Sequence, residues 1–322
     1  MTRRLKLILF LWLCSAAPVF AQNSGSLPIV GVLRLDTAES VKPFKTVFPD
    51  ALAALGQVDG RNIHIDLRLA EGHAERFPEL AQALMREKAA VIVASGDAAV
   101  RAAQQATKTI PIVGIVDDIV GAGLIDSLAR PGGNTTGVSI LAGELDAKRL
   151  EILKQLVPSG PSFAVLRDPS SATALPVLLA DAARQLGIEL YSVDVSTPAD
   201  FTSAFASFRA GGSQALLMRS SPLIFGFRAE LCELSLTYKL PAITQTREMA
   251  EAGCLVSYGT RISEVYTIAA ELTDKMLKGT RAGDTPGQQP TRFELVINLK
   301  TAKTLGLTIP PLILARAEEV IE

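Results

Sequence analysis

The chain has 322 residues, of which 48% are hydrophobic and 20% charged, and its formal net charge is −1. This length predicts about two domains, and the composition is that of a folded globular protein rather than a disordered one. Because the sequence has no basic excess and no basic run, nucleic acid is not an expected partner.

Residues 1–21 are predicted to form a secretory signal peptide. Three basic residues precede the apolar run 7–13, and small residues stand at positions −3 and −1 of a cleavage site after Ala21. The run is too short to span a bilayer comfortably. Cleavage would remove those three basic residues and the only tryptophan, Trp12, which changes the net charge from −1 to −4. We therefore expect a protein of the periplasm.

The first lobe is predicted from alternating strand and helix patterns. Strands are expected at 28–35, 61–69, 90–94, 110–116 and 136–139, and helices at 43–55, 75–88, 98–107 and 123–129. Strands that alternate with helices favour a parallel sheet.

The second lobe is predicted to begin with helix 143–156, and a new α/β series follows the Pro-Ser-Gly-Pro turn at 158–161. Its strand-helix-strand unit at 188–221 repeats the one at 63–96 about 125 residues earlier, and both units end in small hydroxyl residues. The expected strands are 163–167, 188–193, 214–218, 240–244, 253–257 and 293–298, and the expected helices are 143–156, 173–186, 198–210, 224–237, 247–251, 263–278 and 299–305.

The predicted fold class is α/β, with two doubly wound parallel-sheet lobes joined by a hinge of several segments. Helix 263–278 is expected to return to the first lobe. The N-terminal lobe would then comprise residues 28–139 plus about 258–280, and the C-terminal lobe 143–257 plus about 284–322.

Polar loops follow the predicted strands, and ligands of open α/β sheets bind outside the carboxyl ends of the strands. Each loop alone is typical of a helix cap or turn, but several at one sheet edge favour a pocket for a small polar ligand. The candidate ligand-binding residues are Thr37, Ser95, Gly96, Asp97, Asp117, Asp118, Asp168, Ser170, Ser171, Ser220, Ser221, Thr246, Arg247 and Tyr258.

Four of these candidates, Asp117 and Asp118 as a pair, Arg247 and Tyr258, have two interpretations. The pair Asp117-Asp118 can accept hydrogen bonds from a ligand, or one member can cap the following turn. Arg247 can clamp a ligand carboxylate, or it can pair with a nearby glutamate at the surface. Tyr258 is placed either in the cleft or at the hinge.

Catalytic and metal-binding patterns are scarce, so neither an enzyme nor a cofactor or metal is expected. The two histidines, His64 and His73, lie away from the predicted strand ends. Cys232 and Cys254 lack metal-ligand spacing. They can pair in an oxidising compartment, but both lie in segments that look buried, and the sequence leaves their pairing open.

Several long motifs resemble the ABC-transporter substrate-binding protein family, in the type I periplasmic-binding branch that includes aromatic amino-acid binders. The motifs are Gly60–Ile63, Gly121–Leu124, Ser127–Asn134 with Thr136-Gly137, Ala252-Gly253 with Ser257–Gly259, and Glu294–Lys303, and the similarity extends over essentially the whole mature chain. The resemblance implies a two-lobed receptor that closes on a solute and presents it to a membrane permease.

The chain departs from the family pattern mainly in the loops. Asp97, Asp117, Ile119, Arg167 and Ser220-Ser221 replace residues that are usual there. We therefore do not transfer the family's ligands, and with few aromatic residues in these loops we expect a small polar solute, favouring an amino acid or related carboxylate.

The predicted function is a monomeric periplasmic solute receptor that serves an ABC permease. Two alternatives stay open: a sensory receptor that signals to a membrane kinase, and a secreted enzyme that uses Asp117 and Asp118 as acid and base.

Overall fold

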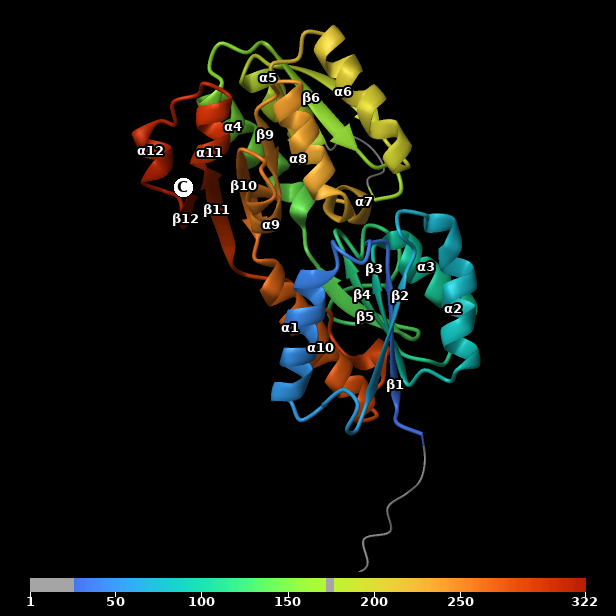
Figure 1. The fold of residues 1–322 in the computed structure, drawn as a ribbon. Coiled ribbons are helices and arrows are strands. Elements are labelled where there is room, and N and C mark those ends of the chain that lie inside the picture. Colours follow the sequence, from blue (N-terminus) through green and yellow to red (C-terminus); the bar gives the residue numbers. More distant parts are fainter. Residues whose placement is uncertain (1–25, 172–176) are drawn as a thin grey trace, which may run out of the picture.

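Two α/β lobes, one above the other in Figure 1, make up the protein. The computed structural model describes residues 26–171 and 177–322. The predicted signal peptide and the first residues of the expected helix 173–186 lie outside the described residues. Within these ranges, no helix combines the length and the apolar character needed to cross a membrane.

The first lobe is built on a five-stranded parallel sheet in the order β2-β1-β3-β4-β5. The three central strands β1, β3 and β4 are apolar and almost entirely buried, as expected of a parallel sheet covered on both faces, whereas the edge strand β2 is half-exposed. The strands are β1 (Ile29–Arg34), β2 (His64–Leu69), β3 (Val91–Ser95), β4 (Ile112–Val116) and β5 (Thr135–Ser139).

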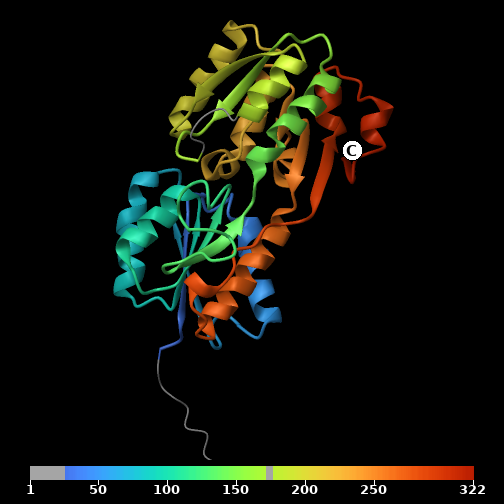
Figure 2. The same cartoon turned by 180° about the vertical axis from the view of Figure 1, so that it is seen from behind.

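Helices cover both faces of this sheet (Figures 1 and 2). On one face, α1 (Lys42–Ala54) packs against α10 (Ile262–Leu277), and Phe44, Phe48 and Tyr266 are buried between them and the strands. On the other face lie α2 (Phe77–Arg86), which follows the short 3-10 turn η1 (Ala74–Arg76), and α3 (Asp97–Ala106). Helix α10 therefore packs on the first sheet although it follows most of the second lobe in sequence.

The second lobe contains a seven-stranded sheet in the order β12-β11-β10-β9-β8-β6-β7. All neighbouring pairs are parallel except β10 with β11, which are antiparallel. The strands are β6 (Ser162–Arg167), β7 (Glu189–Asp194), β8 (Ala215–Met218), β9 (Ala242–Thr244), β10 (Val256–Thr260), β11 (Phe293–Asn298) and β12 (Glu319–Ile321).

The second sheet is also covered on both faces. One face packs against α6 (Phe201–Ala210, after η3, Pro198–Asp200), α8 (Arg228–Thr237) and α9 (Arg247–Glu251), with α7 (Pro222–Gly226) at the edge near the first lobe. The other face packs against α4 (Asp146–Leu156, after η2, Ala142–Leu145), α5 (Val177–Gln185), α11 (Leu299–Thr304) and α12 (Pro311–Leu314).

Three segments connect the lobes. The first, residues 140–145, joins β5 to α4; the second is the junction of β10 with α10 around Arg261; the third lies between Gln288 and Phe293. The expected start of the C-terminal lobe at about 284 falls too early. Gln288 still forms a bridge with Val138 of β5, so residues 282–288, which include η4 (Ala282–Asp284), stay with the first sheet.

The expected helix 123–129 is wrong, because this segment consists of turns. Gly123 has a φ of +66°, outside the helical region, and the N–H of Asp126 donates to the carbonyl of Pro131 rather than to a helical partner. The expected helix 224–237 is divided into α7 and α8 at Phe227. The short elements α12 and β12 were not predicted.

Cys232 and Cys254 form a disulfide, with 4.7 Å between their Cα atoms. Both are completely buried, Cys232 on α8 and Cys254 just before β10. The burial that seemed to argue against pairing is compatible with it, since a disulfide has no polar group that needs water.

Candidate functional site

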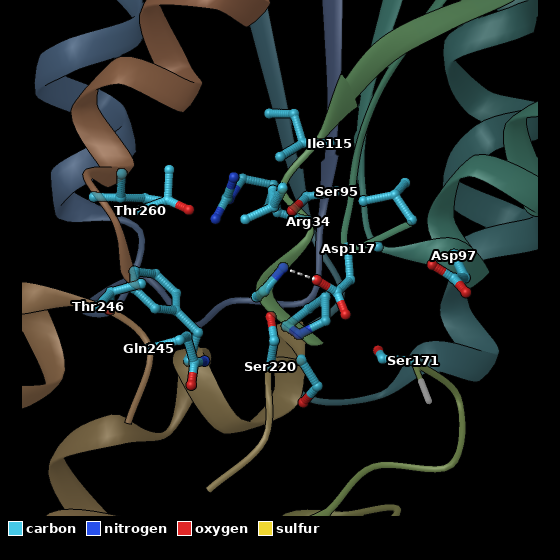
Figure 3. Close-up of a pocket in the computed structure, with 18 of the residues that line it drawn as sticks. Arg34, Ser95, Asp97, Ile115, Asp117, Ser171, Ser220, Gln245, Thr246 and Thr260 are labelled. Carbon is cyan, nitrogen blue, oxygen red and sulfur yellow. Dashed lines mark hydrogen bonds between the residues drawn. The ribbon is translucent and has the colours of Figure 1, made fainter. Parts of the chain in front are cut away.

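A cavity lies between the lobes at the carboxyl ends of their parallel strands (Figure 3). Its empty space, open solvent at the mouth included, is about 700 Å³. Eight of the fourteen predicted site residues line it, four from each lobe: Ser95, Gly96, Asp97 and Asp117 from the first, and Ser171, Ser220, Ser221 and Thr246 from the second.

The wall from the first lobe includes the turn between β3 and α3. Gly96 caps α3 with a φ of +89° and a ψ of 157°, a conformation that is essentially confined to glycine. It turns the chain so that Asp97 begins the helix at the cavity. Burial raises the pKa of Asp97 to about 6, and the nearby carboxylates of Asp117 and Asp168 add to this, while Arg101 opposes it.

Asp117, after β4, connects the cavity to the first crossing segment. Its carboxylate, labelled in Figure 3, accepts hydrogen bonds from two backbone N–H groups of that segment. The donors are Ala142 and Gly143, the latter at 3.2 Å. Burial raises the pKa of Asp117, and the negative charge of Asp146 contributes. The residue thus lines the site and also holds the backbone of the hinge.

The wall from the second lobe follows β8. Ser221 caps α7, because its Oγ accepts a hydrogen bond of 2.9 Å from the N–H of Ile224. Ser220 precedes it and is partly exposed at the cavity. Pro222 touches the first lobe directly, since a Cβ added to Gly96 would lie 2.5 Å from its Cγ. The two lobes are therefore in contact around the cavity.

Arg34 is the main functional candidate that the sequence analysis missed. It ends β1, and its side chain is only 4% exposed. Nε donates to Asp36 at 2.7 Å, Nη2 donates to the hydroxyl of Tyr266 at 3.2 Å, and the guanidinium lies 4.7 Å from the ring centre of Phe44. Within the part of the chain that the structure describes, Nη1 has no hydrogen-bond partner.

The charges around Arg34 keep it ionised. Burial disfavours the cation, but the neighbouring Asp36 and Tyr266 outweigh burial and raise the pKa of Arg34 above its ordinary value. Burial raises the pKa of Tyr266 to about 12, so its hydroxyl is neutral. Arg34 and Thr260 lie toward one side of the cavity in Figure 3, and Asp97 lies toward the other.

Six predicted residues lie outside this lining. Arg247 pairs with Glu251 at 2.7 Å and with Glu319, which is the surface interpretation rather than the clamp. Asp118 accepts a hydrogen bond of 2.8 Å from the N–H of Gly121 and so holds a turn. Asp117 and Asp118 therefore do not both face the cavity, as the alternative of an enzyme that uses them as acid and base would require.

The other four lie nearby. Asp168 is buried and accepts from the N–H of Ser170, which lines a smaller adjoining space. Thr37 bonds to Ser40 and borders a neighbouring surface cavity. Tyr258 packs beside the core of the second lobe.

The remaining lining is more apolar than the predicted loops suggested. Ile115, Val116, Ile140, Ala142, Pro222, Phe225 and Ile262 contribute carbon surface, while Gln245, Thr260 and Tyr266 add polar groups. Gln245 and Thr260 each have a buried side-chain oxygen without a partner among the described residues. A cation, two carboxylates and apolar walls together suit a small amphiphilic solute better than a purely polar one.

Two lobes of this topology that meet around a cavity are the architecture of the type I periplasmic-binding fold. The chain belongs to the family described as ABC transporter substrate binding protein, whose model matches residues 30–321. This confirms the resemblance seen in the motifs.

Known relatives agree with this assignment. The chain is 29% identical to a tyrosine-binding protein of Clostridioides difficile (strain R20291) over 281 residues, 86% of this chain and 81% of the relative. A conserved domain protein from Vibrio cholerae is 28% identical, with a TM-score of 0.84 over 92% of this chain and 100% of the other. A domain from Streptococcus pneumonia in complex with L-Trp is 25% identical, with a TM-score of 0.83 over the same shares.

Proposed function

We propose that the protein is a periplasmic receptor of an ABC importer that encloses an amino acid or related carboxylate between its lobes and delivers it to a membrane permease. The observation that carries this proposal is the cavity at the facing strand ends, lined by both lobes. A ligand that contacts both lobes binds the closed form better than the open form, so it shifts the equilibrium toward closure. The permease would recognise the closed arrangement.

Several details of the proposal rest on the sequence. We propose cleavage after Ala21, a monomeric mature protein, and binding without chemical change to the solute. The last point is supported by Asp118, which bonds to Gly121 and does not line the cavity, so the Asp117-Asp118 pair is not assembled there.

The amino-acid preference is supported by Arg34 and by the relatives, one a tyrosine-binding protein and one solved with L-Trp. The apolar lining, with Phe225 at the cavity, also removes the reason for disfavouring an aromatic solute.

A thermal-shift screen of the mature protein against amino acids, organic acids and sugars tests the binding function. A ligand present at 100 times its Kd adds roughly 2.7 kcal/mol to the free energy of unfolding. Because Trp12 is the only tryptophan, an external dye must report unfolding after cleavage. Transport is tested by deletion of the gene: lost uptake of the solute supports an importer, whereas normal uptake with lost gene induction supports the sensory alternative.

A further inference from the structure

The guanidinium of Arg34 has one unused donor at the cavity. Asp36 holds Nε at 2.7 Å and the hydroxyl of Tyr266 holds Nη2 at 3.2 Å, while Nη1 is buried with no partner in the described ranges. A buried donor without an acceptor is costly, and more so when it carries charge. The ion pair with Asp36 therefore does not explain why the Nη1 donor is buried at the cavity.

The position of Arg34 is fixed before any ligand arrives. The rings of Phe44 and Tyr266 lie 4.7 and 5.4 Å from its guanidinium carbon, and Asp36 is itself only 1% exposed. A side chain held in this way loses little further conformational entropy when it binds a ligand. These contacts preorganise the free Nη1 at the cavity.

The chemistry of the free group selects its partner. Arginine is always charged and donates only, so Nη1 needs an acceptor, and a carboxylate forms the strongest hydrogen bond with it. The hydroxyl of Thr260 is a second buried group without a partner among the described residues, and it lies on the same side of the cavity. It can donate to the same anion.

The opposite side of the cavity has the opposite sign. Asp97 lies there, and Asp117 lies between it and Arg34 in Figure 3. A second carboxylate on the ligand would face these two side chains, whereas a cationic amine would be attracted to them. The distribution of charge therefore disfavours dicarboxylates and favours one carboxylate combined with an amine.

Resting on the proposed function, we propose that Arg34 is the specificity-determining residue that binds the solute's single carboxylate, and that Asp97 and Asp117 exclude acidic side chains. Asp36 and Tyr266 are positioning residues for Arg34. Apolar groups of the solute lie against residues such as Ile115 and Phe225.

The experiment is a calorimetric titration of the mature protein with the twenty protein amino acids, and then with the α-carboxamide of the tightest-binding one. In the wild type we expect the carboxamide to bind roughly 10- to 100-fold more weakly, as for loss of a hydrogen bond between two charged groups. L-Glutamate and L-aspartate should bind weakest. In Arg34→Gln, acid and carboxamide should bind equally.

Arg34→Gln leaves the charge of buried Asp36 without the arginine and can unfold the protein. A second variant therefore combines Arg34→Gln with Asp36→Asn, which replaces the ion pair by two neutral amides. Arg219→Gln is the matched control, because Arg219 is also a buried, ion-paired arginine whose Nη1 has no partner among the described residues, but it does not line the cavity. The control should keep the full difference between acid and carboxamide.

Two results would overturn the proposal, and they separate it from the proposed function. If an amino acid binds but its preference over the carboxamide survives in both Arg34 variants, Arg34 is not the anchor and the receptor function stands. If the tightest ligand in the thermal-shift screen of amino acids, organic acids and sugars has no carboxylate, the anchor and the amino-acid preference both fail.

Discussion

The contact between Gly96 and Pro222 provides a test of lobe closure. Gly96 belongs to the first lobe and Pro222 to the second, and a Cβ at position 96 would lie 2.5 Å from Pro222 Cγ. Ordinary contacts of this kind begin near 3.4 Å, so Gly96→Ala requires the closed lobes to separate by almost 1 Å. Overpacking of this kind costs about 1–3 kcal/mol. We expect the Kd of the solute to rise roughly 5- to 150-fold.

A second cost of Gly96→Ala appears in a different measurement. The φ of +89° is unfavourable for alanine by about 1–3 kcal/mol whether the lobes are open or closed. This strain lowers the free energy of unfolding but cancels from the binding equilibrium. Gly187→Ala is the matched control, because Gly187 has a φ of +63° and nothing within 4 Å of its added Cβ. It should lose stability and keep its affinity.

The assay combines calorimetric titration with urea unfolding in a cycle with Pro222→Ala. The Pro222 Cβ would lie an ordinary 3.7 Å from the new Cβ, so shortening the proline should restore most of the affinity lost in Gly96→Ala. Unchanged affinity in Gly96→Ala, or an equal loss in the presence of Pro222→Ala, would refute the idea that this contact forms on closure.

Three further predictions concern stability, each measured by urea unfolding. Burial raises the pKa of Asp97 in the folded protein to about 6, so its ionisation destabilises the fold above that pH. The wild type should therefore gain stability relative to Asp97→Asn as the pH falls from 7 to 5. A difference in unfolding free energy that does not change with pH would contradict this. Buried Asp146 pairs with both Arg149 and Arg219, so Asp146→Asn leaves two buried cations uncompensated and should lower the free energy of unfolding by about 3–5 kcal/mol. The control Glu39→Gln breaks an exposed pair and should change it by under about 0.5 kcal/mol. Similar effects of the two variants would argue against a stabilising role for the Asp146 pairs. Replacing Cys232 and Cys254 by serine opens a 22-residue loop and should cost about 3 kcal/mol, and an unchanged midpoint under reductant would show that the bond does not stabilise the protein.

Most of the strands and helices could be predicted from the sequence, because buried strands and amphipathic helices have different patterns of apolar residues. Buried strands such as β1 and β4 are continuous apolar runs, and the helices between them are amphipathic. The errors occurred where local signals compete with tertiary contacts. Residues 123–129 have helical composition, but Gly123 and the turn at Pro131 determine their backbone.

The candidate site was predictable only in part. Polar loops after strands identified Ser95, Asp97 and Ser220, because topology alone brings strand ends together. Arg34 could not be identified from the polar loops, because it is the last residue of the otherwise apolar strand β1. A single charged residue in such a strand does not by itself indicate a binding site. Arg247 begins α9 directly after a polar loop, as expected, but its partner Glu319 is 72 residues away and is brought to it only by the fold.

The discontinuous first lobe has a consequence for the order of folding. The ribosome makes the chain from its N-terminus, so strands β1 to β5 are synthesised more than a hundred residues before helix α10. This helix covers one face of their sheet. Until α10 is available, the apolar groups that pack against Tyr266 and Leu272 stay open to water. We therefore expect that a fragment ending at residue 257 cannot form a stable lobe, and that the whole chain must leave the ribosome before either half reaches its native state.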